Sequence, residues 1–399
     1  MILFLTACTP DPETARQRAL ETRLDTIVEE GLREKAYAGA VLLVARRGEV
    51  IHEKAYGYGR KYSSGHIPLK TPEPMATDTL FDVASMTKGF ATTFGIMLLV
   101  DRGQIELDVP LYRYIPLFDK GKKRDITIRH LLRHRAGLHP WKPVYYHAAD
   151  REGAIAYIAS LPLKYPVGSE YHYSDLGFMI LGYVIESVSG RPLDRYLSEN
   201  LYASLGLKRT SFCPLAGGFT GIAATSQGNP FERRMVADDT FGYTCDEKAD
   251  AFRGWRHYTL RGEVNDGNAF YAHQGIAGHA GLFSTAADLK ILAEVLIGRG
   301  IYRGRNVVSP ETVKAFLTPD EFGNGLGWSF RPEVIKAQDA PAGSFGHTGF
   351  TGCSVLVVPD REIIVIFLTN RQHEGLTESG GYPDLNNLRR KIVQAVLNF

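Results

Sequence analysis

The sequence has 399 residues, of which 44% are hydrophobic and 23% are charged, and its formal net charge at pH 7 is only +2. This length and composition indicate a globular protein that can bury a large core. Because the charge is close to zero and no long basic run is present, the sequence argues against a nucleic-acid partner and against a basic surface for anionic membranes.

The N-terminal segment carries the first candidate site. A short apolar run leads to Leu5-Thr6-Ala7-Cys8, which resembles a bacterial lipobox, where the cysteine is lipidated and the preceding segment is removed. The run lacks a charged leader and is too short to span a bilayer. We predict that residues 1–20 are a lipoprotein-signal-like segment and linker, with Cys8 as lipidation site and membrane anchor of a periplasmic or cell-envelope protein. A disordered apolar terminus is the alternative.

The elements that follow are predicted from hydrophobic spacing. Apolar residues recur at helical intervals between Pro12 and Lys35, which predicts a helix. Two β-rich runs are joined by Arg47-Gly48-Glu49 and predict a hairpin. The residues from there to about Asp78 are rich in turn formers, and we expect them to form loops.

The rest of the chain divides into a helical part and a strand-rich part. Residues 85–207 mostly show helical spacing, residues 213–272 are irregular, and a helix over 284–300 begins with Thr285 and Asp288 as a capping box. We expect strands from both ends of the chain to pair in one antiparallel sheet. The later strands are predicted at 325–330, 343–349, 353–359 and 361–370, followed by an amphipathic helix at 385–399.

Cysteine and histidine spacing predicts neither a disulfide framework nor a metal site. Cys213, Cys245 and Cys353 are an odd set without a C-x-x-C, so buried thiols are expected. His130 and His134 are four residues apart on a predicted helix, as zinc ligands can be, but no H-E-x-x-H is present. We interpret that pair as solvated or loop-packing residues, and we expect no cofactor.

A serine and a lysine stand where the helical part begins, in the stretch FDVASMTKGF. Residues three apart share one face of a helix, so the amine of Lys88 is expected beside the hydroxyl of Ser85. A serine needs a base to become a nucleophile, and a lysine is a base only when its pKa is lowered. The alternative is an ordinary helix start with a charge on its first turn.

Two later stretches favour the catalytic interpretation. Tyr173-Ser174-Asp175 precedes a predicted helix, and His347-Thr348-Gly349 lies on a predicted strand. Together with S-M-T-K, this ordered set resembles the serine β-lactamases and penicillin-binding proteins. The resemblance is closest to the class C-like branch, which includes DD-carboxypeptidases, muropeptide amidases and esterases. It extends from about Leu24 to the C-terminus.

The resemblance implies an α/β (α+β) fold of the β-lactamase/transpeptidase type. In this fold an antiparallel sheet is flanked by helices, a mostly helical lobe is inserted, and the active site lies between the two. We assign the sheet and its helices to about 21–80 and 285–399, and the lobe to about 81–284, within a catalytic domain at 21–399.

The resemblance also implies roles for individual residues. Ser85 would attack a carbonyl and form an acyl-enzyme, while Lys88 and Tyr173 share the proton transfer, with the primary base left open. The backbone N–H groups of Ser85 and Phe350 would form the oxyanion hole. The segment His347-Thr348-Gly349 would line the substrate side.

Two positions depart from the pattern of the family. Asp175 stands where many relatives have asparagine, and it is expected either to cap the following helix or to pair with Lys88 and leave the base role to Tyr173. His347 replaces a frequent lysine and is mostly neutral at pH 7, so we expect a weaker hold on a β-lactam carboxylate.

A further stretch, LRGEVNDGNAFYAHQGIAGHAGLF, resembles a feature of the peptidoglycan-fragment amidases and carboxypeptidases of this branch. Asn265 replaces a histidine that those relatives often have. Asp266, His273 and His279 lie close to glycines and are candidates for the crevice, with ordinary loop structure as the alternative.

The predicted function is a serine hydrolase that acts on amide or ester bonds of peptidoglycan-derived or related small substrates. Within enzymes, the alternatives are a promiscuous carboxylesterase and a weak β-lactamase. The alternative of another class is a penicillin-binding sensor that is acylated and does not turn over. The expected partner is a small-molecule or peptide substrate, and the oligomeric state is left open.

Overall fold

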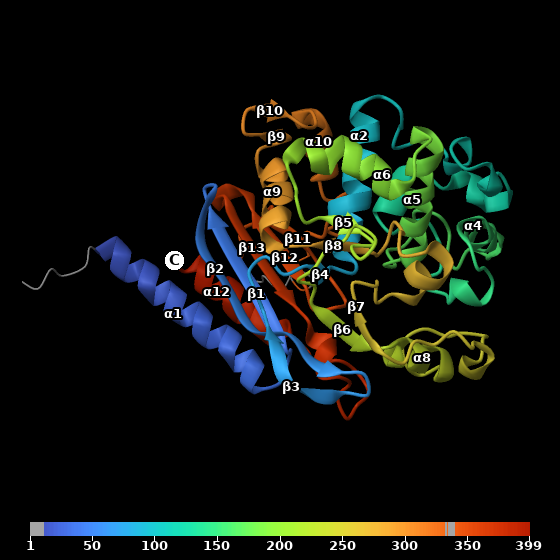
Figure 1. Ribbon diagram of the computed structural model, residues 1–399. Coiled ribbons are helices and arrows are strands. Elements are labelled where there is room, and N and C mark those ends of the chain that lie inside the picture. The colour runs from blue at the N-terminus through green and yellow to red at the C-terminus, as the bar shows by residue number, and fades with distance from the viewer. Residues whose placement is uncertain (1–11, 332, 334–339) are drawn as a thin grey trace, which may run out of the picture.

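The computed structural model describes residues 12–331, 333 and 340–399. Its centre is a six-stranded antiparallel sheet that joins both ends of the chain (Figure 1), in the order β11-β12-β13-β1-β2-β3. The N-terminal hairpin and the C-terminal strands share this sheet because β1 pairs with both β2 and β13. The strands are β1 (Gly39–Arg46), β2 (Glu49–Ser63), β3 (Ile67–Pro74), β11 (Phe345–Thr348), β12 (Ser354–Val358) and β13 (Ile363–Thr369).

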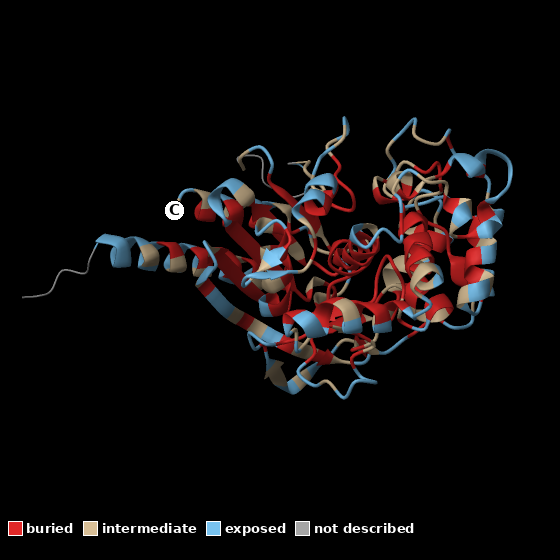
Figure 2. Cartoon of the chain, turned by 90° about the horizontal axis from the view of Figure 1, so that it is seen from above, coloured by how far each residue is buried: buried red, intermediate tan, exposed pale blue. Residues whose placement is uncertain are grey.

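Both faces of the sheet are covered, and the central strands are therefore apolar throughout. Successive side chains of a strand point to opposite faces, so Val41 and Leu43 enter the core shared with the helical lobe. Leu42 and Val44 enter the core beneath the two terminal helices. Figure 2 shows buried segments through the middle of the molecule and exposed ones at its rims.

Helices form the outer layers. The terminal helices α1 (Pro12–Arg33) and α12 (Asn386–Leu397) contact each other on one face, and α9 (Ala286–Ile297) contacts β1 and β13 on the other. The lobe lies beyond α9 (Figure 1). Its helices are α2 (Phe94–Asp101), α3 (Ile128–Leu132), α4 (Arg151–Ser160), α5 (Asp175–Ser189), α6 (Leu193–Leu197), α7 (Ala203–Leu205) and α8 (Pro230–Ala237), and α10 (Pro310–Phe316) follows α9.

Short strands complete the fold. A three-stranded sheet in the order β4-β8-β5 supports the segment that carries Ser85, and two-stranded pairs form elsewhere. These strands are β4 (Phe81–Asp82), β5 (Ser211–Phe212), β6 (Ala224–Gln227), β7 (Thr259–Arg261), β8 (Leu282–Ser284), β9 (Ile301–Tyr302) and β10 (Arg305–Asn306).

Most predicted elements are confirmed, and two predictions are wrong. The first helix, the hairpin, the last three strands and the final helix all form. The segment expected as loops up to Asp78 instead extends β2 to Ser63 and adds β3, because pairing with the sheet outweighs its turn-forming residues. The strand expected at 325–330 is reduced to isolated bridges at Ser329.

The cysteines that the structure describes are free thiols. Cys245 and Cys353 are buried, as expected, whereas Cys213 is only partly buried. Cys8 lies outside the described residues. Within the described part of the chain, no helix has both the length and the apolar character needed to cross a bilayer.

Candidate active site

Ser85 lies on a tight turn between a short strand and a helix. After β4 the chain turns at Ala84, whose φ of +46° is in the left-handed region that a residue with a side chain rarely adopts. Asp82 stabilises this turn because its Oδ1 accepts a hydrogen bond of 2.9 Å from the Ala84 N–H. The turn ends at Ser85, and a helix begins directly after it, so the hydroxyl stands at the helix N-terminus.

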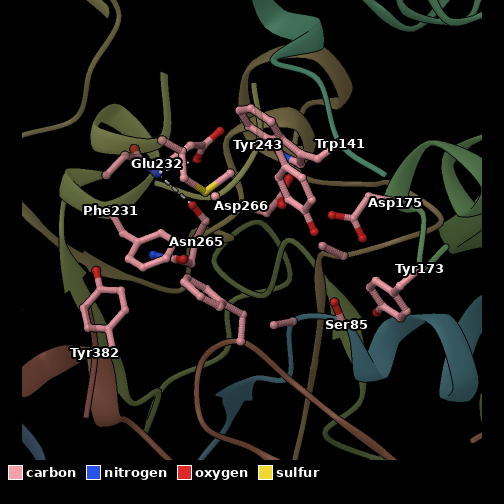
Figure 3. Close-up of a pocket in the computed structure, with 16 residues that line it drawn as sticks. Ser85, Trp141, Tyr173, Asp175, Phe231, Glu232, Tyr243, Asn265, Asp266 and Tyr382 are labelled. Carbon is pink, nitrogen blue, oxygen red and sulfur yellow. Dashed lines mark hydrogen bonds between the residues drawn. The ribbon is translucent and has the colours of Figure 1, made fainter. Parts of the chain in front are cut away.

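The side chains of Ser85, Lys88 and Tyr173 converge. Lys88 Nζ donates hydrogen bonds to Ser85 Oγ (3.0 Å) and to the His279 carbonyl (3.1 Å), and it lies 2.7 Å from Asp175 Oδ1. The Tyr173 side chain lies beside those of Lys88 and Ser85, with Lys88 Nζ 4.9 Å from the centroid of its ring. Figure 3 shows Ser85, Tyr173 and Asp175 at one side of a cavity. Lys88 is 0% exposed, so its ammonium is shielded from water, whereas Ser85, Tyr173 and Asp175 are partly exposed at the cavity.

Asp175 pairs with Lys88 and does not cap the helix. The cap of α5 is Ser174, whose hydroxyl accepts the Gly177 N–H. Burial lowers the pKa of Lys88, but the charges of Asp175 and Tyr173 outweigh burial and hold that pKa above its ordinary value. Burial raises the pKa of Tyr173 above its ordinary value, although the Lys88 ammonium opposes this increase. A protonated lysine cannot accept a proton, so the geometry favours Tyr173 as the base, in a phenolate form that Lys88 stabilises.

We expect the Asp175→Asn variant to change the pH dependence of turnover. Asp175 raises the pKa values of both Lys88 and Tyr173, so removing its charge lowers both. If the Tyr173 phenolate is the base, kcat/KM rises toward alkaline pH, and the variant shifts that rise to lower pH. Steady-state rates from neutral to alkaline pH measure the shift. A rise that stays at the same pH in the variant contradicts this assignment.

The end of β11 lies against the Ser85 turn. A Cβ added at Gly349 would stand 2.4 Å from the Val83 carbonyl oxygen, so only glycine permits this approach. Phe350, the next residue, lines the same cavity as Ser85. Neither of their backbone N–H groups donates a hydrogen bond to another described residue. Two free donors beside a nucleophile are what an oxyanion hole requires.

His347 and Thr348 line a small cavity beside the main one, together with Tyr171, Tyr173 and Trp328. His347 Nδ1 and the Thr348 carbonyl oxygen are 2.8 Å apart, so the ring donates from Nδ1. Burial and the charge of Lys88 lower the pKa of His347 to about 4. The ring is therefore neutral at pH 7 and carries no charge to attract a substrate carboxylate.

The lowered pKa of His347 predicts a loss of stability in acid. The unfolded chain binds a proton near pH 6.5 and the folded protein only near pH 4, so stability is present above pH 6.5 and falls as the pH drops toward 4. We expect this residue to contribute about 2 kcal/mol of destabilisation between pH 7 and pH 5. Urea unfolding of wild type and His347→Gln at both pH values measures it. An equal decrease of the free energy of unfolding from pH 7 to pH 5 in both proteins would contradict the prediction.

Of the three candidates near Asn265, only Asp266 lines the main cavity. The imidazole of His279 is buried, and its Nε2 lies 2.9 Å from Asp266 Oδ1. The backbone carbonyl of His279 accepts a hydrogen bond from Lys88. His273 is buried, and its Nε2 lies 2.5 Å from the Tyr183 hydroxyl. The side chain of His273 therefore has a structural role. The Asn265 side chain is held by hydrogen bonds with Ser226 and Gln372.

The main cavity has a volume of about 460 Å³, and sequence reasoning missed most of its wall. The missed residues are largely aromatic, and their positions in the sequence are scattered, so no local pattern signals them. Figure 3 shows them around the space above Ser85. They are Trp141, Phe231, Glu232, Tyr243 and Tyr382.

His130 and His134, which were interpreted as solvated or loop-packing residues, both make hydrogen bonds within the protein. His130 Nδ1 lies 3.1 Å from the hydroxyl of the helix cap Thr127, and His134 Nδ1 accepts the Ser174 N–H at 3.0 Å. The described residues include no group of three or more histidine, cysteine or acidic side chains that could hold a metal ion.

The family model described as Beta-lactamase matches residues 24–384. The chain belongs to the beta-lactamase family. It is therefore a serine hydrolase of that family, and the resemblance and the fold class predicted from the sequence are confirmed.

Within the beta-lactamase family, relatives align over nearly the whole chain. The "N-acetylmuramyl-L-alanine amidase" of Bacillus subtilis (strain 168) is 34% identical, over 94% of this chain and 86% of that protein. A protein of Escherichia coli (strain K12) named "Putative D-alanyl-D-alanine carboxypeptidase" is 32% identical, over 88% of this chain and 82% of that protein. A solved penicillin-binding protein homologue from Caulobacter crescentus has a TM-score of 0.69 at 20% identity, covers 96% of this chain and 97% of its own, and shows the shared fold.

Proposed function

We propose that the protein is an amidase that cleaves peptidoglycan fragments through an acyl-enzyme on Ser85. The observation that carries this proposal is the 3.0 Å contact between Ser85 Oγ and Lys88 Nζ, together with the Tyr173 hydroxyl, at the edge of an open cavity. The amidase named above, which aligns over 94% of this chain, supports the substrate class.

The acylation step follows from these contacts. Ser85 Oγ bonds to the substrate carbonyl carbon, and its proton passes to the Tyr173 phenolate beside Lys88. The N–H groups of Ser85 and Phe350 hold the negative oxygen of the tetrahedral intermediate. The C–N bond then breaks, and the proton moves from Tyr173 to the leaving nitrogen.

Deacylation reverses the same proton transfers. Water gives a proton to the Tyr173 phenolate and adds its oxygen to the ester carbon. The bond between that carbon and Ser85 Oγ then breaks, the proton returns from Tyr173 to Oγ, and the carboxylic acid product leaves. The reaction consumes only substrate and water, and all three side chains return to their starting state.

The charges in the cavity favour an amidase over a carboxypeptidase. A carboxypeptidase substrate ends in a carboxylate beside the scissile bond, which a lysine or arginine would attract. None of the described residues that line the main cavity is a lysine or an arginine. His347 lies in the neighbouring cavity and is neutral at pH 7 because its pKa is lowered to about 4.

Intact-mass spectrometry tests the proposed function. The protein is incubated separately with N-acetylmuramyl-L-alanyl-D-isoglutamine, a D-alanyl-D-alanine peptide, p-nitrophenyl acetate and a fluorescent penicillin. We expect release of the dipeptide from the muramyl substrate and a transient adduct on Ser85. Cleavage of the D-alanyl-D-alanine peptide alone favours the carboxypeptidase, cleavage of the ester alone favours the esterase, and a penicillin adduct that persists without turnover favours the sensor.

A further inference from the structure

Tyr173 lies outside any helix or strand. It belongs to the irregular segment 171–174, which comes directly before α5, and it is partly exposed at the main cavity. A misplacement of about 1 Å in a catalytic group costs about 10²-fold in rate. The position of the Tyr173 hydroxyl beside Ser85 therefore depends on the neighbours that hold this segment.

His134 binds the backbone on both sides of Tyr173. Its carbonyl oxygen accepts the His172 N–H at 3.0 Å, and its ring Nδ1 accepts the Ser174 N–H at 3.0 Å. The Tyr165 hydroxyl donates to the same carbonyl oxygen at 3.3 Å. One residue thus holds the chain immediately before and immediately after the tyrosine.

The imidazole of His134 also packs on the phenol ring. The centroids of the His134 and Tyr173 rings are 4.4 Å apart, with 34° between the ring planes. The ring of His347 lies farther away, at 6.3 Å from that of Tyr173. The His134 imidazole is buried and packs at the same time on Phe178 of α5, at 5.0 Å between centroids. It therefore links the phenol to a rigid helix.

The backbone of His134 adopts a conformation that favours other residues. His134 follows the end of α3 and has a φ of +56°. Glycine and asparagine are the usual residues at such a position, because a larger side chain at positive φ collides with the backbone. A histidine here costs stability, and strained residues of this kind gather at functional sites. The strain points to a role of the imidazole that glycine could not fill.

The imidazole is neutral, as its contact with Ser174 requires. Burial and the positive charge of Lys88 hold the pKa of His134 well below its ordinary value. Because Nδ1 accepts a hydrogen bond, the proton of the neutral ring is on Nε2. A protonated ring would place an N–H at Nδ1 against the N–H of Ser174. The low pKa keeps this hydrogen bond intact at neutral pH.

We propose that His134 is a positioning residue that holds the Tyr173 hydroxyl in place beside Ser85. Its carbonyl oxygen and Nδ1 fix the backbone on either side of the tyrosine, and its ring fixes the phenol. The proposal rests on the base role proposed above for Tyr173. His134 is not among the described residues that line the main cavity, so it acts through Tyr173 and not on the substrate.

Three replacements separate the hydrogen-bond acceptor from the ring. In His134→Asn, the amide oxygen is as many bonds from Cα as Nδ1 is, and asparagine tolerates a positive φ. His134→Phe keeps an aromatic ring and removes the acceptor, and His134→Ala removes both. On p-nitrophenyl acetate we expect kcat to fall by about 10- to 10²-fold in the Phe and Ala variants and by less than about threefold in the Asn variant. KM should change little in all three.

A double-mutant cycle separates positioning from general support of the fold. His134→Phe is combined with Tyr173→Phe, and the effect of the histidine replacement on kcat is compared in the two backgrounds. If His134 acts through the Tyr173 hydroxyl, its replacement lowers kcat by a factor of only about one where that hydroxyl is already absent. The same large factor in both backgrounds overturns the proposal.

His130→Phe is the matched control. The Nδ1 of His130 accepts the Thr127 N–H at 3.2 Å, so this change removes a backbone-to-imidazole hydrogen bond of the same kind at the other end of α3. Urea unfolding should show a loss of stability in both histidine variants, whereas kcat should fall only in His134→Phe. An equal fall of kcat in both variants overturns the positioning role.

Two measurements are independent of the amide substrate. The rate of phosphonate labelling of Ser85, followed by intact mass, should fall in His134→Phe and be largely restored in His134→Asn. Crystal structures of wild type and His134→Phe should show the Tyr173 hydroxyl displaced from Ser85 in the variant. An unmoved hydroxyl or an unchanged labelling rate overturns the role of His134 and leaves the Ser85 chemistry standing. A wild type that is labelled and does not cleave the muramyl substrate overturns the proposed substrate class alone.

Discussion

Replacing Ser85 with alanine is expected to abolish turnover and labelling by a serine-reactive phosphonate. The hydroxyl that accepts the 3.0 Å hydrogen bond from Lys88 is then absent, and no acyl-enzyme can form. Loss of a serine nucleophile of this kind lowers kcat by about 10⁶-fold. Intact-mass spectrometry and steady-state rates on a nitrophenyl ester measure the two effects.

The control for the serine replacement is Ser169→Ala, which removes an exposed hydroxyl. Its rate and its labelling should match those of wild type. Thermal unfolding of both variants checks that the fold is kept. Phosphonate labelling or turnover that survives in Ser85→Ala would show that another residue is the nucleophile.

The second large effect is expected from Tyr173→Phe. The phenol hydroxyl lies beside Ser85 and Lys88, and a phenylalanine keeps the ring and removes the proton carrier. General-base removal costs about 10²- to 10⁴-fold in rate. The loss should appear in kcat and kcat/KM alike, and the rise of rate toward alkaline pH should disappear with it.

Tyr157→Phe is the matched control for the tyrosine variant. Tyr157 stacks on His147 and does not line the main cavity, so its hydroxyl cannot exchange a proton with a substrate bound there. If Tyr173→Phe retains the wild-type rate and pH profile, the base is a different group. Lys88 would then be the leading candidate, after loss of its proton to Asp175.

The effect of Asp175 on Lys88 could be predicted only as a pair of alternatives. The sequence places an aspartate at the start of α5, where it can cap a helix or reach another side chain. The choice depends on Ser174, whose hydroxyl caps the helix. Asp175 is then free to pair with Lys88, with 2.7 Å between Asp175 Oδ1 and Lys88 Nζ. Such a competition between neighbours is decided by backbone geometry, which spacing does not contain.

The sequence by itself determined the short-range parts of this protein. Hydrophobic spacing predicted the terminal helices and every strand of the main sheet except β3, because burial of alternate or every third and fourth side chain requires those periods. The motif set also located Ser85, Lys88 and Tyr173, whose side chains meet in the structure.

Only the tertiary structure decided what surrounds those residues. Trp141, Phe231, Glu232 and Tyr382, none of them predicted, come from separate segments of the chain, and they meet in one cavity because the lobe packs against the sheet. Likewise, β3 formed from residues rich in turn formers because β2 offered an edge to pair with. Contacts of this kind depend on the packing of whole elements, so no local pattern of residues can signal them.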